Sequence, residues 1–245
     1  MAGTDGEDGD EGDFGALGAW GDEGTDGSPG SSSGVYTPVE RPHCDLIVDC
    51  PPGQMNWETC TCGESPIVLD VLGNGFRLTS KNGGVLFDLG CLGVPRQTSW
   101  TAADSDDVWL VLDRNGNGLI DDGSELFGNF NDQPNPPIGQ EKNGFLALAV
   151  FDKYEEGGNA DGMISSKDSA FRRLRLWRDS NQNGVSEASE LFRLSDLGVR
   201  TIHLNYHRSD RVDEHGNQFR YRARVLDARD SQLGRWAWDF WLVSD

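Results

Sequence analysis

The stretch DSNQNGVSEASE, residues 179–190, constrains the fold more than any other segment of this chain. Calcium takes six to eight oxygen ligands. A twelve-residue loop of the EF-hand type supplies them from side chains at positions 1, 3 and 5, the carbonyl at 7, often a water at 9, and a two-oxygen carboxylate at 12. Every position is filled here, and the glycine at position 6 allows the sharp turn. The alternative is an Asn- and Gly-rich turn without metal, but the full pattern predicts a calcium loop with the ligands Asp179, Asn181, Asn183, Val185, Glu187 and Glu190. We expect an exit helix to begin after this loop, at Leu191.

A second segment, residues 113–125, starts in the same way but has Ser124 where the closing carboxylate should stand. Glu125 comes one residue late, and the nearby Gly123 gives the backbone the freedom to absorb that extra residue. We therefore expect a non-standard calcium site, with Asp121 or Asp122 as substitute ligands. Its main ligands are predicted to be Asp113, Asn115, Asn117, Leu119 and Glu125.

A third segment, residues 152–168, fits the same pattern if it contains an insertion. With Gly162 at position 6, Gly157 falls at position 1 and offers no side-chain oxygen, so we expect the chain to loop out after Asp152 and return that carboxylate to the first position. Ile164, at position 8, is expected to pair backbone to backbone with the neighbouring loop. Asp closes this loop in place of Glu, which predicts a weaker site with the ligands Asp152, Asn159, Asp161, Met163 and Asp168.

Two stretches that begin at Asp70 and Asp88 resemble eroded copies of these loops. Their middle positions are Leu or Gly, and an apolar residue cannot coordinate a cation. We interpret both as turns, in which Asp70, Asn74 and Asp88 satisfy backbone groups.

The rest of the sequence alternates between strand and turn patterns. Residues 66–72, 84–88 and 108–112 are predicted to be buried strands, and residues 144–151 a short buried helix capped by Asn143. The C-terminal end predicts an antiparallel meander. Its three runs each place alternate apolar residues on one face: Ile202, Leu204 and Tyr206; Phe219, Tyr221, Ala223 and Val225; Trp236, Trp238, Phe240 and Leu242. We therefore predict an α+β fold, in which EF-hand-like helix-loop-helix calcium units pack with short β-strands and a C-terminal antiparallel meander.

Composition divides the chain into three parts. Residues 1–42 form an acidic Gly-, Asp- and Ser-rich tail, which we expect to be disordered because it has almost nothing to bury. Residues 43–64 are a Cys-rich segment, and residues 65–245 form the predicted calcium-binding domain. The net charge of −20 argues against nucleic acid as a partner, and no apolar run reaches the roughly 18 residues that membrane insertion requires.

Four cysteines lie close together, at Cys44, Cys50, Cys60 and Cys62. Their spacing differs from that of zinc fingers and ribbons, which favours two disulfides over a zinc site and indicates an oxidising compartment. No secretory signal is visible at the start, so an extracellular or cell-surface location implies a start that is incomplete or processed. The remaining Cys91 is expected to be a small buried apolar side chain, with a free thiol or a mixed pairing as alternatives.

Three strings carry a resemblance to a known family: SPIVLD at residues 65–70, LDRNGNGLIDDGSELFG at residues 112–128 and LWRDSNQNG at residues 176–184. They resemble bacterial EF-hand-like secreted proteins, a family that includes the calcium-dependent self-processing modules of repeats-in-toxin (RTX) exoproteins. The resemblance covers roughly residues 57–245 and implies calcium binding and an extracellular or surface location for the parent protein.

The self-processing modules of that family cut an Asp-Pro bond at their own start, through the Asp carboxylate. The matching dipeptide here is Ser65-Pro66, which has no carboxylate. A serine hydroxyl without a neighbouring base is a poor nucleophile, so we expect this activity to be absent.

The sequence therefore favours a calcium-stabilised extracellular structural or binding module, with Ca²⁺ as its cofactor, other extracellular proteins as candidate partners and no enzyme activity. The alternative is a calcium-dependent self-processing module. A calcium sensor would need Met-rich helices, and the chain has three Met residues. The four His residues show no nucleophile-base spacing, and we interpret the alternating Arg220, Arg222 and Arg224 as a solvated strand face.

Overall fold

The computed structural model describes residues 55–56, 61–137, 140–229 and 235–244. All of them belong to the compact unit Glu40–Asp245. The predicted acidic tail and Cys44, Cys50 and Cys60 lie outside the described residues. No described helix is both long enough and apolar enough to cross a membrane.

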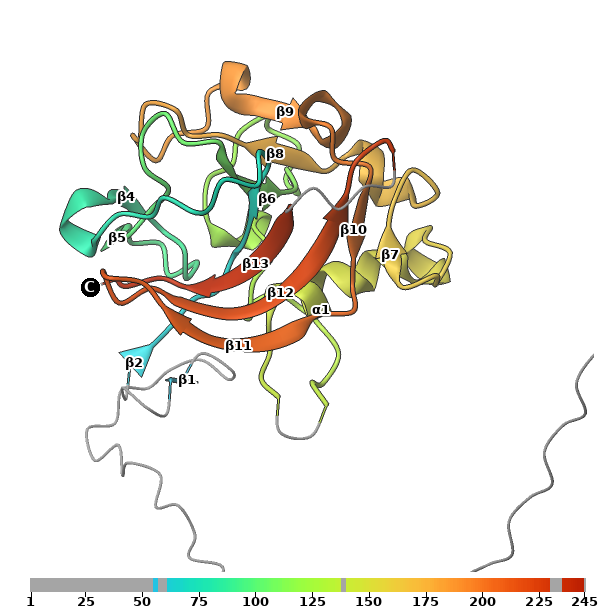
Figure 1. Ribbon diagram of the computed structural model, residues 1–245, viewed down its shortest axis with the longest axis horizontal. Coiled ribbons are helices and arrows are strands. Elements are labelled where there is room, and N and C mark those ends of the chain that lie inside the picture. Colours follow the sequence, from blue (N-terminus) through green and yellow to red (C-terminus); the bar gives the residue numbers. More distant parts are fainter. Residues whose placement is uncertain (1–54, 57–60, 138–139, 230–234, 245) are drawn as a thin grey trace, which may run out of the picture. The chain divides into compact units, whose positions relative to one another are not determined.

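A curled antiparallel sheet forms the centre of this unit, and Figure 1 shows β11, β12 and β13 curving together. Within the described residues the sheet has nine strands, in the order β7-β10-β12-β13-β3-β6-β8-β9, and β11 pairs with β12 beside this path. The last long strand therefore lies in the middle of the sheet, between β12 and the early strand β3. The strands are β3 (Ile67–Asp70), β6 (Asp107–Val111), β7 (Met163–Ile164), β8 (Arg175–Trp177), β9 (Leu191–Arg193), β10 (Thr201–His203), β11 (His207–Val212), β12 (Gln218–Leu226) and β13 (Trp236–Trp241).

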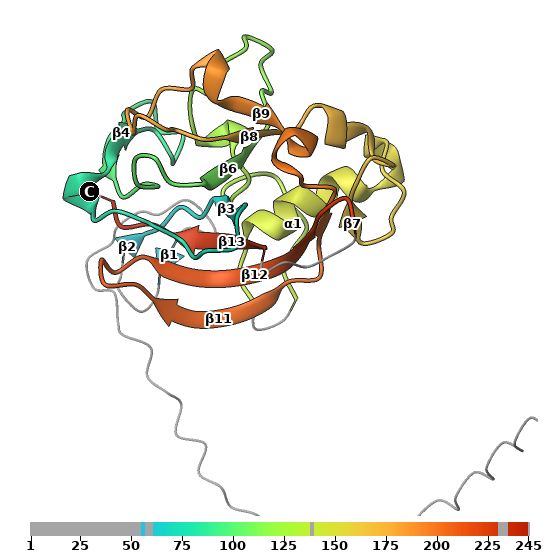
Figure 2. The ribbon, with the colours of Figure 1, turned by 45° about the horizontal axis from the view of Figure 1, so that its top comes forward.

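Both faces of the central strands are buried. Side chains alternate between the faces of a strand, so Ile67 and Leu69 of β3 pack into one core while Val68 packs into the other. The first core includes Phe145 of the helix α1 (Gly144–Ala149), which lies beside β7 in Figures 1 and 2. The second core includes residues of the hairpin formed by β4 (Val85–Phe87) and β5 (Arg96–Thr98).

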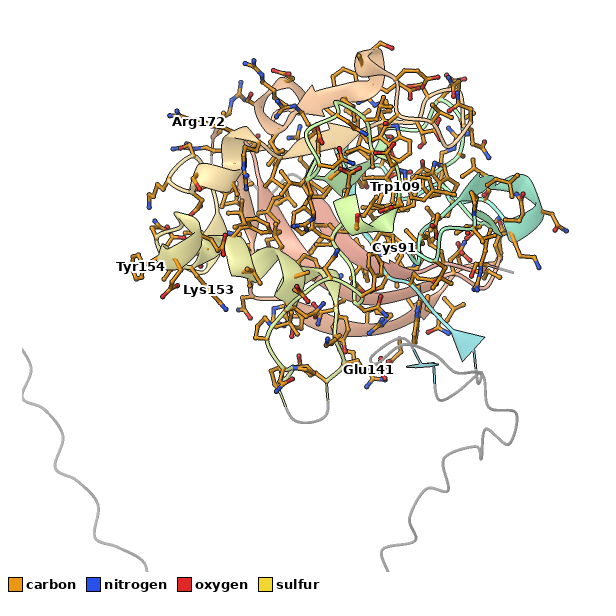
Figure 3. The ribbon with its side chains drawn as sticks, turned by 180° about the vertical axis from the view of Figure 1, so that it is seen from behind. Cys91, Trp109, Glu141, Lys153, Tyr154 and Arg172 are labelled. Carbon is orange, nitrogen blue, oxygen red and sulfur yellow. The ribbon has the colours of Figure 1, made fainter. Side chains whose placement is uncertain are left out.

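The second core is built around tryptophans. The rings of Trp100 and Trp109 stack with centroids 4.0 Å apart, and Trp177 meets Trp100 edge to face at 5.5 Å. Figure 3 shows Trp109 within the packed interior, whereas Tyr154 projects at the periphery. A small separate hairpin joins β1 (Met55–Asn56) to β2 (Thr61–Cys62).

The predicted α+β class with helix-loop-helix units is wrong, because the main architecture of the described residues is a curled antiparallel β-sheet with a single α-helix of six residues. The segment that was expected to start an exit helix, Leu191–Arg193, is strand β9 and pairs with β8. The Asp179 loop therefore connects two antiparallel strands. A β-ladder with a neighbouring strand satisfies the backbone of this segment, and that tertiary pairing overrides a local helical pattern.

Several local predictions are confirmed. The three expected strands correspond to β3, β4 and β6, and the Asn143 side chain caps α1 by accepting hydrogen bonds from the amides of Phe145 and Leu146. The C-terminal meander is present, but a bulge in β12 between Phe219 and Tyr221 turns these two side chains into different cores. The expected solvated Arg face is wrong at Arg220, which is buried.

Candidate metal centres

Each of the three predicted loops is closed by the same hydrogen bond. The carboxylate at position 1 accepts from the amide of the glycine at position 6, at 2.9 Å in the Asp113 loop and at 2.8 Å in both the Asp152 and Asp179 loops. All three glycines have positive φ angles, between 70° and 86°, a region that residues with a Cβ rarely adopt. The sequence pattern therefore predicted the turn geometry correctly in all three loops.

The Asp179 loop is held from inside by the tryptophan core. Asp179 Oδ2 accepts from the indole of Trp100 at 2.8 Å, and Glu190 Oε2 accepts from the indole of Trp177 at 3.3 Å. Glu190 Oε1 also accepts from the amide of Ser180 at 2.9 Å, so positions 1 and 12 are fixed by buried donors. The carboxylate orientations in this loop are coupled to the packing of the second core.

Glu187, at position 9, lies opposite Glu190 in the same loop. Its Oε1 accepts from the side-chain amides of Asn181 and Asn183, at 3.2 and 2.8 Å, while its Oε2 is shielded from solvent and has no hydrogen-bond partner. Burial raises the pKa of Glu190, and the hydrogen bond that a protonated Glu190 donates to Glu187 raises it further. Accepting that hydrogen bond lowers the pKa of Glu187. The carboxyl groups of Glu187 and Glu190 therefore face one another, and no amide, hydroxyl or indole group of the described residues donates to Glu187 Oε2.

The Asp113 loop repeats this arrangement. Glu125, which is 1% exposed, turns into the loop through a 3₁₀ helix at Gly123–Glu125 and accepts from the amides of Arg114 and Asp121, each at 2.9 Å. A Cβ on Gly123 would lie 1.7 Å from the Leu89 carbonyl oxygen, so glycine is required for this path.

The substitute ligands predicted for this loop differ in orientation. Asp121 Oδ2 accepts from the side-chain amides of Asn115 and Asn117, as Glu187 does in the Asp179 loop. Asp122 instead caps the amide of Ser124 at 2.8 Å. Of the two substitutes, Asp121 faces the loop.

The Asp113 and Asp179 loops meet at position 8. The amide of Ile120 donates to Ser186 Oγ at 2.6 Å, and both residues are buried. Ile164, which was expected to make the contact between loops, pairs instead with Ile202 of β10. That prediction is wrong because the Asp152 loop lies at a different end of the sheet.

The Asp152 loop contains the predicted insertion. A 3₁₀ helix at Tyr154–Glu156 loops out and Gly157 reverses the chain at φ 79°, which brings the Asp152 carboxylate to the Gly162 amide. Asp168 accepts from the amides of Asn159 and Ser165, at 3.2 and 2.7 Å.

One carboxylate of this loop already forms an ion pair with a lysine. Lys167 Nζ lies 3.1 Å from Asp161 Oδ2, and the hydrogen bond from Asn159, with a smaller contribution from Lys167, lowers the pKa of Asp161. A cation at this loop would compete with the ammonium group for Asp161.

The two eroded copies are turns, as predicted. Asp70 accepts from the amides of Gly73 and Gly75 at 2.6 and 2.7 Å, and Asp88 accepts from the amides of Leu92 and Gly93. Asn74 differs from the prediction, because its side-chain amide donates to the Asp106 carboxylate at 2.9 Å and not to a backbone group.

Over the described ranges, no group of three or more His, Cys, Asp or Glu side chains is placed to hold a metal ion. The expected ligands of the three loops combine carboxylates with Asn amides and backbone carbonyls. Calcium binding stays a prediction on this geometry.

The cysteine predictions have different outcomes. Three of the four clustered cysteines lie outside the described residues and Cys62 lies in β2, so the two disulfides stay a prediction. Cys91 is not buried as expected but exposed, with a free thiol. It occupies a left-handed turn position at φ 57° and belongs to neither core. Partial desolvation, followed by the charge of Asp122, raises the pKa of this thiol to about 12.

A further polar centre, which the sequence did not predict, surrounds Ser65. The Ser65 hydroxyl donates to Asp239 Oδ2 at 2.9 Å, and the Gly144 amide donates to the same oxygen at 2.6 Å. Both Ser65 and Asp239 are 0% exposed. The expectation that Ser65 lacks a neighbouring base is therefore wrong, because a carboxylate 174 residues away in the chain lies beside it. The sequence signal that could have indicated this centre is Asp239, an acidic residue within the Trp-rich strand β13.

Unsatisfied polar atoms gather at this centre. Asp239 Oδ1, Arg220 Nη1 and Trp241 Nε1 are buried without hydrogen-bond partners. Arg220 Nε lies 3.9 Å from Asp239 Oδ1, and its guanidinium carbon lies 4.3 Å from the centroid of the Trp241 ring. Desolvation raises the pKa of Asp239 to about 6, against the opposing charge of Arg220. Arg220 Nη2 also donates to Glu141, which projects from the segment before α1 in Figure 3.

Comparison with known proteins places this geometry in context. The family model described as the SPM domain matches residues 67–242. The iron-regulated protein FrpA of Neisseria meningitidis serogroup C is 41% identical over 143 residues, which are 58% of this chain and 12% of FrpA. The chain thus spans a small part of the curated relative it matches. Both matches are consistent with the RTX-related family expected from the sequence.

Proposed function

Because this chain belongs to the SPM domain family, through a match over residues 67–242 that contains all three loops, we propose that it is a calcium-binding module stabilised by calcium. The Asp179 loop provides the main site, and the Asp113 loop provides the second site beside it. The Asp152 loop is the weakest, because Lys167 must leave Asp161 before a cation gains that carboxylate.

The observation that carries this proposal is the free acceptor of Glu187. Its Oε2 is shielded and lacks a donor, while Glu190 lies within hydrogen-bond reach across the loop. Two carboxylates within hydrogen-bond reach of one another destabilise the folded state unless a proton or a cation lies between them. Calcium accepts carboxylate, amide and carbonyl oxygens together, which matches the composition of this loop.

Calcium would stabilise the fold through the contacts behind the loop. Asp179 and Glu190 accept from Trp100 and Trp177, so fixing the carboxylates also fixes two members of the second core. A ligand that binds the folded state alone adds about 2.7 kcal/mol at a hundredfold excess over its Kd. Two neighbouring sites, each with calcium at a hundredfold excess over its Kd, would therefore add about 5 kcal/mol to the free energy of unfolding.

We further propose an extracellular or cell-surface setting for this module, with other extracellular proteins as partners. Loops with several neutral Asn ligands favour dissociation constants of about 10⁻⁵ to 10⁻³ M, the range of weak sensors and extracellular calcium modules. Such affinities leave the loops empty at low calcium and filled at millimolar calcium.

Thermal unfolding in calcium, magnesium and chelator tests the proposal. The melting temperature should rise strongly with millimolar calcium and little with magnesium, because long loops rich in oxygens suit the larger ion. Tryptophan fluorescence should change over the same calcium range, since Trp100 and Trp177 contact the Asp179 loop. Melting that does not depend on calcium would contradict the proposal.

The family match also supports a second candidate, a self-processing module. In this chain the carboxylate required before Pro66 is absent, and we propose that the Asp-Pro reaction does not take place. A fragment that begins at Pro66 after calcium addition would show that self-processing occurs at this bond.

A further inference from the structure

We propose that Ser65 is a nucleophile positioned to attack the carbonyl carbon of Glu64, so that this chain can convert the Glu64-Ser65 peptide bond to an ester and then cleave it. This proposal does not rest on calcium binding. It rests on the buried centre formed by Ser65, Asp239 and Asn129.

Ser65 and Asp239 form a nucleophile-base pair. An activated hydroxyl lies within about 2.6–3.2 Å of a base, and a third group orients that base. Ser65 Oγ donates to Asp239 Oδ2 at 2.9 Å, and the Gly144 amide holds the same oxygen at 2.6 Å. Arg220 faces the other carboxylate oxygen from 3.9 Å. The centre therefore has a nucleophile, a base and two groups that orient the base.

Asn129 fixes the segment on both sides of Glu64. Its side-chain nitrogen donates to the Gly63 carbonyl and its side-chain oxygen accepts from the Ser65 amide, each at 2.9 Å. Its own amide also donates to Ser65 Oγ at 3.3 Å. Asn129 is thus a positioning residue, because it fixes the backbone on both sides of Glu64 and also contacts the Ser65 hydroxyl.

Ring size selects the bond. Attack of Ser65 Oγ on the preceding carbonyl passes through a five-membered ring, whereas attack on its own carbonyl, at the Ser65-Pro66 bond, would need a strained four-membered ring. As the bond from Oγ to the Glu64 carbonyl carbon forms, Asp239 takes the hydroxyl proton. The bond between that carbon and the Ser65 nitrogen then breaks, and Asp239 returns the proton to the nitrogen.

Water completes the reaction. A water molecule adds to the ester carbon and releases the Glu64 carboxyl group and the Ser65 hydroxyl, so the products are a chain ending at Glu64 and a chain starting with the free amine of Ser65. Arg220 Nη1 and Trp241 Nε1 are unpartnered donors at this centre, and Trp241 packs directly against Gly63. Preorganised donors of this kind stabilise an oxygen on which negative charge develops, and we assign that role to them in this proposal.

The protonation properties of the base suit this chemistry. A general base works best when its pKa lies near the working pH, and burial raises the pKa of Asp239 to about 6. Loss of a general base slows a reaction by roughly 10² to 10⁴.

Hydroxylamine tests the proposal because it attacks esters at neutral pH and traps the intermediate as a hydroxamate. The full chain is incubated with and without hydroxylamine, in calcium and in chelator, and the products are identified under denaturing conditions by mass and N-terminal sequence. We expect a fragment that begins at Ser65 and a partner that ends in the Glu64 hydroxamate. Cleavage at Asn-Gly bonds such as Asn82-Gly83 gives different masses and is counted separately.

Variants assign the chemistry. Ser65→Ala should lose the product, and Ser65→Cys should increase the trapped yield because a thioester reacts faster. Asp239→Asn should slow product formation roughly 10² to 10⁴-fold. The control Ser99→Ala should behave as the parent, since Ser99 is equally buried but donates to Asn217 rather than to a carboxylate.

Three results would overturn the proposal. The first is that neither the folded parent nor the folded Ser65→Cys variant gives a fragment that begins at Ser65. The second is that Ser65→Ala gives as much of this fragment as the parent, and the third is a fragment that begins at Pro66 instead. The Ser65 variants keep the test decisive if Asp239→Asn does not fold. The calcium-binding proposal is judged separately by melting and fluorescence, so either proposal can fail while the other stands.

Discussion

Replacing Glu190 with Gln removes one charge from the Asp179 loop while keeping the size of the side chain. Glu190 accepts from the Ser180 amide through one oxygen and from the Trp177 indole through the other. Gln has one oxygen, so one of these donors would face an NH₂ group, and calcium would gain one neutral oxygen in place of the two-oxygen carboxylate at position 12. We expect calcium binding at this loop to weaken roughly tenfold to a hundredfold in Kd, which is about 1.5–3 kcal/mol.

The same substitution should have a much smaller effect without calcium. Glu187 and Glu190 face one another in the loop, and Glu190→Gln removes one carboxylate of this pair. In chelator, relief of the repulsion between them offsets the lost hydrogen bond, so the variant should melt close to the parent, while in millimolar calcium it should melt clearly lower. Calorimetric titration measures the affinity, and tryptophan fluorescence follows the melting in both conditions.

Glu214→Gln is the matched control, because it removes the same charge from an exposed turn. It should leave calcium affinity and melting in calcium unchanged. If Glu190→Gln kept the same number and strength of sites as the parent, the assignment of this loop would be refuted.

Three further predictions test other parts of the molecule. Glu125→Gln should weaken calcium binding at the Asp113 loop and leave binding at the Asp179 loop unchanged, so that a calorimetric titration loses one of its two binding phases. Loss of both phases would show that the two loops do not bind calcium independently. Gly158→Ala places a Cβ 2.2 Å from the Asp152 carbonyl carbon, so melting in chelator should show a cost of about 1–3 kcal/mol, and an unchanged melting curve would contradict the described path of the insertion. Burial raises the pKa of Asp239 from 3.8 to about 6, so its contribution to stability is full below pH 4 and is lost as the pH rises to about 6. Urea unfolding of the parent in chelator should show this fall, and Asp239→Asn should flatten it; equal slopes would argue against a raised pKa.

Local patterns in the sequence predicted the parts of the fold that depend on local interactions. Apolar runs identified β3, β4 and β6, and Asn143 marked the start of α1 through its short polar side chain. The exit helix at Leu191 was wrong because its residues find hydrogen-bond partners in β8, and this pairing is not visible in a local window. Similarly, Arg220 alternates with two exposed arginines, but the bulge in β12 turns it toward the buried Asp239.

The three loops could be predicted from local spacing, whereas the Ser65 centre depends on a long-range contact. The sharp turn at the glycine of position 6 lies within one loop, so spacing alone predicted it. Even the insertion after Asp152 could be inferred, because a missing oxygen had to be replaced from nearby. The bond between Ser65 and Asp239 joins residues from opposite ends of the domain, and no local spacing records it.

The position of β13 also has a consequence for the rate and order of folding. Its residues Ala237, Trp238 and Asp239 pair with Leu69, Val68 and Ile67 of β3, while its other edge pairs with β12. The early strand β3 therefore keeps an open edge until residues some 170 positions later have left the ribosome. Pairings of such long range close slowly, because the loop entropy is lost before the contacts are gained. During synthesis, the centre of this sheet is thus the part that remains longest exposed to pairing with other chains.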